Sequence, residues 1–216
     1  MNQKSVKYSV WFLILFYAVG ITGFVIPQTH SFFKSLTPFA LLMSAGFLVW
    51  FHRPAYTTKT LLVFVVIFMF SFLAEMVGVQ TGSIFGHYIY GESLGLKILE
   101  TPLIIGLNWL MLIYCTKVIA DRLTNNEKIK PFTGAFLMVF YDLVLEQAAP
   151  KLDMWSWEGG TIPVQNYVAW FVFAFFFHLM IRKAKVEFKN PLAIPVYLIQ
   201  FFFFIILVIY FLIRGL

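Results

Sequence analysis

The sequence has little charge, a single cysteine and no nucleotide-binding motif. Only 12% of its 216 residues are Asp, Glu, Lys or Arg, whereas a soluble domain carries roughly 25%. Hydrophobic residues make up 61% of the chain, more than a soluble core of this size can cover, which excludes an ordinary soluble protein. Cys115 cannot form an intrachain disulfide by itself, so cysteine is uninformative about the redox compartment.

Other absences narrow the chemistry. There is no G-x-G-x-x-G or P-loop sequence, so we expect no nucleotide cofactor. The four histidines, His30, His52, His87 and His178, are scattered, which argues against the histidine-rich membrane di-iron enzymes, and we expect no metal and no cofactor. No Ser- or Gly-rich linker divides residues 1–216, so we predict one transmembrane helical domain.

Long apolar runs fill most of the chain. A membrane-spanning helix needs about 20 mostly apolar residues, and we expect the first run to be an uncleaved span. Prolines stand near many edges of the runs, where they fit a first helical turn and disfavour helix just before themselves. The sequence predicts an all-α polytopic membrane protein with about seven transmembrane helices, at residues 8–26, 36–52, 60–78, 100–119, 131–149, 163–181 and 193–213.

The basic residues support this count. If the flanks of the runs alternate between the two sides of a membrane, twelve of the 16 Lys and Arg residues lie on the side of the N-terminus and four on the other side. Cytoplasmic loops carry the excess of Lys and Arg, so we predict a multi-pass protein of the cell (inner) membrane with a cytoplasmic N-terminus. Basic residues that flank spans form no patch for nucleic acid, and the expected surroundings are a lipid bilayer.

The acidic residues have the opposite distribution. Three of them, Asp121, Glu127 and Glu187, lie in the basic loops, and seven fall in the outer loops or in the outer halves of the third to fifth runs. We expect Glu75 to end the third span and Glu100 to begin the fourth. Polar groups from four runs thus reach one depth, which indicates a site close to the extracytoplasmic face: Glu75, Asn108, Asp142 and Asn166.

Asp142 and Glu146 are the strongest candidates for chemistry. They are four residues apart, so they share one helix face, and a carboxyl group within a span is costly unless it is neutral, paired or hydrated. Two close carboxyl groups do not both ionise easily, so one tends to hold a proton near neutral pH. A protonated acid that faces a dry pocket can protonate an apolar substrate. The alternative is a structural pair bonded to polar residues across the bundle.

Two further motifs lie near the outer face. Gly78, Gly82 and Gly86 recur every four residues, a spacing that favours close helix packing. Residues 152–158 form an outer loop rich in aromatics, either an interfacial belt, where Trp is common, or a cap over a hydrophobic ligand.

Several segments resemble one family of membrane proteins. The block Ala74-Glu75-Met76-Val77-Gly78 with Thr81-Gly82-Ser83-Ile84-Phe85-Gly86-His87-Tyr88-Ile89-Tyr90 is similar to the integral-membrane carotenoid-synthesis family, which includes carotenoid 1,2-hydratases such as bisanhydrobacterioruberin hydratase. The resemblance covers residues 70–175 and continues in order through Pro102, Asn108-Trp109, Tyr141-Asp142, Trp155 and Trp157, and Pro163 with Asn166 and Trp170.

The resemblance implies a cofactor-independent hydro-lyase. Such an enzyme adds water across the terminal C1=C2 double bond of an acyclic carotenoid, through protonation by a carboxylic acid and capture of a tertiary cation by water. We expect Asp142 to donate the proton, and Glu146 or Glu75 to orient the water and accept its proton. The expected substrate- and water-binding residues are Asn108, Tyr141, Tyr88, Tyr90, Trp109, Asp153, Trp155, Trp157 and Asn166.

Three other functions are alternatives to hydration. A carotenoid cyclase or isomerase of the same family would use the same protonation and then lose a proton, which the sequence does not distinguish from hydration. A proton-coupled transporter also uses intramembrane acids, but carriers usually have two repeated halves and a midplane site, and no repeat is visible. A retinal-binding protein needs a lysine in its last span, and residues 191–213 contain none.

Overall fold

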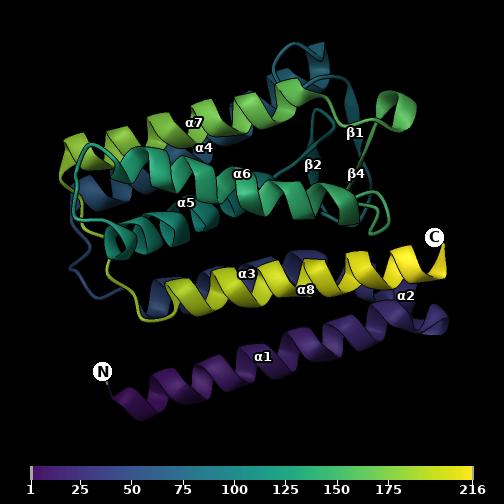
Figure 1. The fold of residues 1–216 in the computed structure, drawn as a ribbon, viewed down its shortest axis with the longest axis horizontal. Helices are drawn as coiled ribbons and strands as arrows, with labels where there is room; N and C mark the ends of the chain where they lie inside the picture. Colours follow the sequence, from purple (N-terminus) through teal and green to yellow (C-terminus); the bar gives the residue numbers. More distant parts are fainter. Residues whose placement is uncertain (1, 216) are drawn as a thin grey trace.

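Long helices lying side by side form most of the molecule. The computed structural model describes residues 2–215, and Figure 1 shows the helices running along one direction, with the two chain ends at opposite ends of the bundle. An odd number of crossings gives this arrangement. The helices are α1 (Gln3–Val25), α2 (Pro27–Ser35), α3 (Thr37–Trp50), α4 (Thr58–Thr81), α5 (Ile104–Leu123), α6 (Lys130–Ala148), α7 (Val164–Ala184) and α8 (Ala193–Arg214).

Each predicted span overlaps a helix. Five helices, α1, α4, α5, α7 and α8, are individually long and apolar enough to cross a membrane, and α2 with α3 would make a sixth if the pair is one broken span. The remaining predicted span is α6, a 19-residue helix that is less apolar because Asp142, Glu146 and Gln147 lie within it. The prediction of an all-α membrane protein is confirmed.

The second predicted span, residues 36–52, coincides with α3, but the separate short helix α2 precedes it. Between α2 and α3 the chain bends by 54°, at Leu36, and each helix has a proline in its first turn. Proline is pre-organised for a helix start but supplies no N–H to continue a preceding helix. The result is a short helix, α2, at the end of the bundle, followed by α3, which runs back toward the other end (Figure 1) and packs against α5.

The outer surface of the bundle is apolar. Large hydrophobic side chains are exposed on several helices, among them Leu15 at 65%, Phe70 at 61%, Phe136 at 64% and Leu212 at 75%. A soluble protein rarely exposes apolar residues so widely, whereas the acyl chains of a bilayer cover such a surface without cost. The polar side chains that would be expected outside are instead buried between the helices, including Glu75, Asp142, Glu146 and Asn166.

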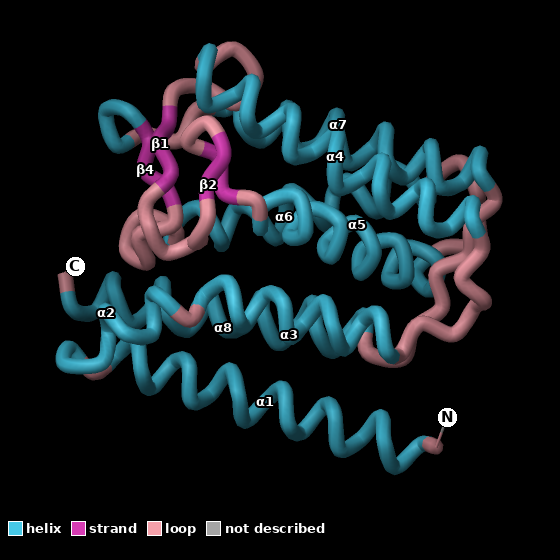
Figure 2. The backbone as a smooth tube through the Cα atoms, turned by 180° about the vertical axis from the view of Figure 1, so that it is seen from behind, coloured by secondary structure: helices cyan, strands magenta, loops and turns pink. Residues whose placement is uncertain are grey.

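Four short strands gather at one end of the bundle. They are β1 (Tyr88–Tyr90), β2 (Lys97–Ile98), β3 (Thr101–Pro102) and β4 (Trp155–Trp157), and a 3-10 turn, Glu158–Gly160, follows β4. β1 pairs with β4, and β2 pairs with β3, both antiparallel. Figure 2 shows β1, β2 and β4 together at the end of the molecule where the C-terminus lies.

The β2–β3 hairpin corrects one expectation. Leu99 and Glu100 form its turn with φ of 46° and 62°, and α5 begins only at Ile104. Glu100 is therefore an exposed turn residue and does not begin a membrane span. The predicted span at 100–119 therefore begins four residues too early, because strand β3 of the hairpin lies between Glu100 and the start of α5.

Candidate active site

The β1–β4 pair turns four aromatic side chains toward the helices. Its register places Tyr88 opposite Trp157 and Tyr90 opposite Trp155. Successive strand residues point to opposite faces, so these four rings share one buried face, whereas Ile89, between the two tyrosines, is 70% exposed. The strands thus form a cap whose inner surface presents two phenol and two indole groups, all of them hydrogen-bond donors.

Glu75 of α4 receives three of the hydrogen bonds beneath this cap. The hydroxyls of Tyr88 and Tyr90 donate to its Oε2 at 2.5 and 2.8 Å, and the indole N–H of Trp109 donates to its Oε1 at 2.9 Å. Burial raises the pKa of Tyr88 and of Tyr90, and the charge of Glu75 raises both further. The two phenols therefore remain protonated donors, and both oxygens of Glu75 have partners.

Glu146 of α6 receives three donors as well. The indole N–H groups of Trp155 and Trp157 donate to its Oε2 at 3.0 and 2.6 Å, and the Asn166 amide donates to its Oε1 at 3.0 Å. The same amide nitrogen of Asn166 donates to Oδ2 of Asp142 at 2.9 Å. Asn166, on α7, thus bridges the two carboxyl groups that are one turn apart on α6.

Asp142 is the least satisfied of the three acids. The side chain is fully buried, and its Oδ1 has no hydrogen-bond partner among residues 2–215. Within the same residues, no Lys, Arg or His forms an ion pair with Glu75, Asp142 or Glu146. An isolated buried carboxylate is costly in an apolar medium, so the free oxygen of Asp142 is suited to carry a proton.

Glycines allow the cap to fold back onto α4. A Cβ atom on Gly78 would lie 2.6 Å from the ring of Phe85 and 3.4 Å from the Tyr88 hydroxyl, so the bare backbone here lets Tyr88 reach Glu75. Gly82 ends α4 in the left-handed conformation at φ 65°, and its missing side chain leaves room for the His87 imidazole. Gly78 and Gly82 therefore pack a turn against its own helix, whereas Gly86 lies against Pro163 and Trp157.

The acids and the cap enclose a very small cavity. Glu75 and Glu146 both line it, together with rings of the cap, and its volume of about 10 Å³ has room for about one water molecule. Asp142 is connected to this cavity through Asn166. The arrangement brings the three predicted acids to one place, together with the predicted residues Tyr88, Tyr90, Trp109, Trp155, Trp157 and Asn166.

Three predicted residues lie elsewhere. The hydroxyl of Tyr141 donates to Gln200 of α8 at 3.4 Å, because a helix turns by about 100° per residue and carries Tyr141 away from the face of Asp142. Asp153 has φ 57° and accepts a hydrogen bond from Ser93 in the neighbouring loop. Asn108 is buried but, among the residues described, has no hydrogen bond to the acids.

The sequence prediction also missed part of the cavity wall. Phe85, Ile105 and Trp170 line it, and the ring of Trp170 stacks on that of Trp109 with centroids 4.3 Å apart. Trp170 is four residues after Asn166 in α7, so the two share a helix face. That spacing was visible in the sequence and could have identified Trp170.

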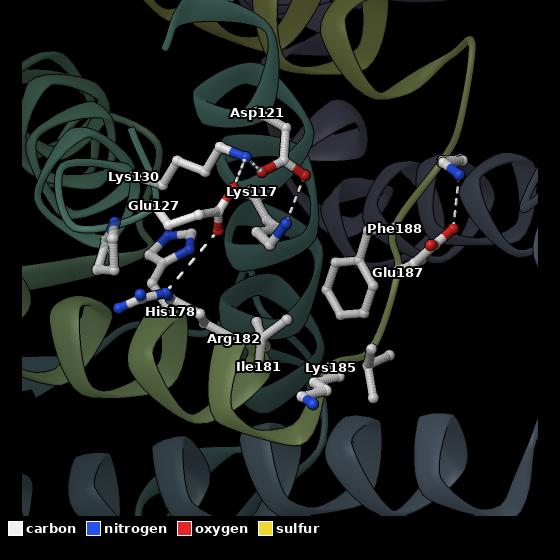
Figure 3. A pocket seen from close by; sticks show the side chains of 13 residues that line it. Lys117, Asp121, Glu127, Lys130, His178, Ile181, Arg182, Lys185, Glu187 and Phe188 are labelled. Carbon is white, nitrogen blue, oxygen red and sulfur yellow. Dashed lines mark hydrogen bonds and ion pairs between the residues drawn. The ribbon is translucent and has the colours of Figure 1, made fainter. Parts of the chain in front are cut away.

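A second, charged pocket lies at the opposite end of the bundle. Figure 3 shows its side chains, and its volume is about 370 Å³. Lys117 pairs with Asp121 and Lys130 with Glu127, and the hydrogen bond from Lys130 lowers the pKa of Glu127 below its usual value. The acids of this pocket are all paired with basic residues, so the acid cluster beneath the strands is the stronger candidate site.

Fold and site together define the class of the protein: an α-helical membrane protein with an acid-lined chamber at one end. A family model described as "Carotenoid biosynthesis protein" matches residues 36–215, and the chain belongs to this family. It is similar to the bisanhydrobacterioruberin hydratase of Haloarcula japonica, with 26% identity over 122 residues, which cover 50% of this chain and 40% of that protein. The match thus spans less than half of the curated relative, and no solved structure matches the chain.

Proposed function

We propose that this protein is a carotenoid hydratase that adds water across the terminal C1=C2 double bond of an acyclic carotenoid. The family supports a carotenoid-modifying role. The observation that carries the specific reaction is the buried acid cluster, in which Asp142 keeps one oxygen free while Glu75 and Glu146 are each held by three donors. Protonation of an alkene and capture of water need both a proton donor and carboxylate acceptors.

The hydrogen bonds favour a division of roles among the acids. Donors stabilise the charged form of a carboxyl group, so Glu75 and Glu146 are suited to be carboxylates. Asp142 accepts from Asn166 alone and lies beside Glu146, so it is the acid best suited to hold a proton. In this assignment Asp142 is the proton donor, and the carboxylates of Glu75 and Glu146 can stabilise the positive charge of a carbocation.

The reaction then proceeds in two steps. The Asp142 proton is transferred to C2, the π electrons of C1=C2 form the new C–H bond, and a tertiary cation remains at C1. The carboxylates of Glu75 and Glu146 and the ring faces of the cap stabilise this cation. A water molecule in the small cavity forms the C1–O bond and gives a proton to Glu146 or Glu75. That proton returns to Asp142, and the net change is the addition of one water without oxidation or reduction.

Hydration differs from the main alternative in needing a water molecule beside the cation. A cyclase or isomerase of the same family would also begin with protonation, but its cation loses a proton and needs no water beside it. The cavity lined by Glu75 and Glu146 is of a size to hold that water.

Expression in a lycopene-accumulating host tests the proposal. We expect products heavier by one or two waters with nearly unchanged visible spectra, because the terminal double bond is outside the conjugated system. The Asp142→Asn variant should fold but give no hydrated product. The control Asp121→Asn changes an acid of the charged pocket at the other end of the bundle and should retain turnover. Isomers of unchanged mass from the wild type would instead establish a cyclase or isomerase.

A further inference from the structure

The acid cavity by itself is too small for the substrate of the proposed reaction. A chamber with room for about one water cannot hold the end of a long polyene, so most of that chain must lie elsewhere. This reasoning rests on the proposed function. The rest of the chain would lie in apolar space that adjoins the acids.

A larger apolar pocket lies between α1, α2, α3 and α8. Its volume is about 200 Å³, and it is lined almost entirely by hydrocarbon and aromatic groups. Rings of Phe16, Phe24 and Phe33 come from α1 and α2, and those of Phe203 and Phe204 come from α8. A flat conjugated chain has a shape that fits between such rings.

Tyr17 and Gln200, two of the polar residues that line this pocket, already have hydrogen-bond partners. The Gln200 amide donates to the Tyr17 hydroxyl at 2.7 Å, and that hydroxyl is 2.8 Å from the hydroxyl of Ser44. A ligand therefore meets no unpaired donor or acceptor from these residues. The chemistry of the pocket selects a pure hydrocarbon over a molecule with a polar end.

The wall of the pocket leads to the acid site. Leu152 and Met154 line the pocket, and the next residue, Trp155, donates to Glu146. Hydrogen bonds from Met154 N–H to the Ala149 carbonyl and from Gly91 N–H to the Met154 carbonyl, both 2.9 Å, hold this segment in place. A single short segment thus separates the apolar pocket from the carboxyl groups.

We propose that this pocket binds the segment of the polyene chain next to the reacting end, which passes the Met154 side chain to reach the acids. Contacts along the hydrocarbon would then supply affinity, and the acid cluster would supply chemistry. The substrate class that follows is a long acyclic polyene hydrocarbon without polar groups in the part that occupies the pocket. A polyene with polar groups along the part that occupies the pocket would bind poorly.

Two glycines provide a matched test. A Cβ atom on Gly20 would lie 3.4 Å from the Phe203 ring at the pocket wall, whereas one on Gly46 would meet nothing within 4 Å. Gly20→Leu therefore fills the pocket, and Gly46→Leu makes the same change on an open face of α3. Ala40→Leu fills the pocket from α3 and serves if Gly20→Leu does not fold.

Binding is measured with lycopene as the probe, from the circular dichroism that an achiral polyene acquires in a chiral pocket of the detergent-purified protein. Filling the pocket should weaken lycopene binding about tenfold or more, while Gly46→Leu should bind like the wild type. Equal binding by the pocket-filling and wild-type proteins would overturn the proposal, as would a pocket that takes up only phospholipid.

The binding assay separates this proposal from the proposed function. If the wild type binds lycopene and Gly20→Leu does not, the pocket assignment holds even where the wild type gives no hydrated product. If Gly20→Leu both binds and hydrates lycopene normally, the pocket assignment fails and the hydratase remains.

Discussion

The assignment of a proton to Asp142 can be tested without substrate. Glu75 and Glu146 each accept three hydrogen bonds, and Asp142 accepts one. A hydrogen bond to a charged group contributes about 1.5–3 kcal/mol. Because Asp142 has two donors fewer, a proton on Asp142 is lower in free energy than a proton on Glu75 or Glu146 by about 3 kcal/mol or more. This difference corresponds to a preference of at least ~100-fold.

Infrared spectroscopy of the purified protein at neutral pH measures this preference. A protonated carboxyl group has a carbonyl stretch that is separate from the bands of carboxylates and amides. We expect one buried protonated carboxyl in the wild type and in Glu75→Gln, and none in Asp142→Asn. A band that persists in Asp142→Asn and disappears in Glu75→Gln would refute the reasoning, because the proton would then sit on the acid with three donors.

Two further predictions concern the cap. Gly82→Ala should lower the free energy of unfolding by about 1–3 kcal/mol, because the residue has positive φ and faces the His87 ring. Thermal unfolding in detergent measures this loss, with Gly46→Ala as the control. Equal stability of the two variants would contradict the prediction. Trp157→Phe removes the 2.6 Å hydrogen bond to Glu146 and should cost about 1–3 kcal/mol. A double-mutant cycle with Glu146→Gln should show coupling, and additive effects would mean that this bond contributes nothing.

The helices could be predicted from the sequence, and the strands could not. Runs of about 20 apolar residues carry a strong local signal, and every such run is helical. The β1–β4 pair has only three residues in each strand, and its partners are distant in the sequence. No local pattern in the sequence determines which short segments pair. The residues that donate to Glu75 and Glu146 were therefore named as candidates, but which acid each one bonds could not be predicted.

The candidate site was predicted best where helical spacing decides. Asp142 and Glu146 share a face as four-residue spacing requires, and Asn166 from α7 meets both. Tyr141 bonds to Gln200 and not to the acids, because neighbouring residues in a helix point in different directions. Asp153 bonds to Ser93 in the neighbouring loop, and the conformation of that loop does not follow from composition.

The cap joins parts of the chain that emerge at different times during synthesis. Glu75 enters the bilayer with α4, but the two tyrosines that bond it are aligned by Trp155 and Trp157, which follow α6. Until those residues arrive, the carboxyl group of α4 lacks this framework and needs water or a neutral form to stay in the membrane. The loop between α6 and α7 therefore completes the surroundings of an acid that entered the membrane with α4, and a chain interrupted before β4 would leave Glu75 in the membrane without this framework.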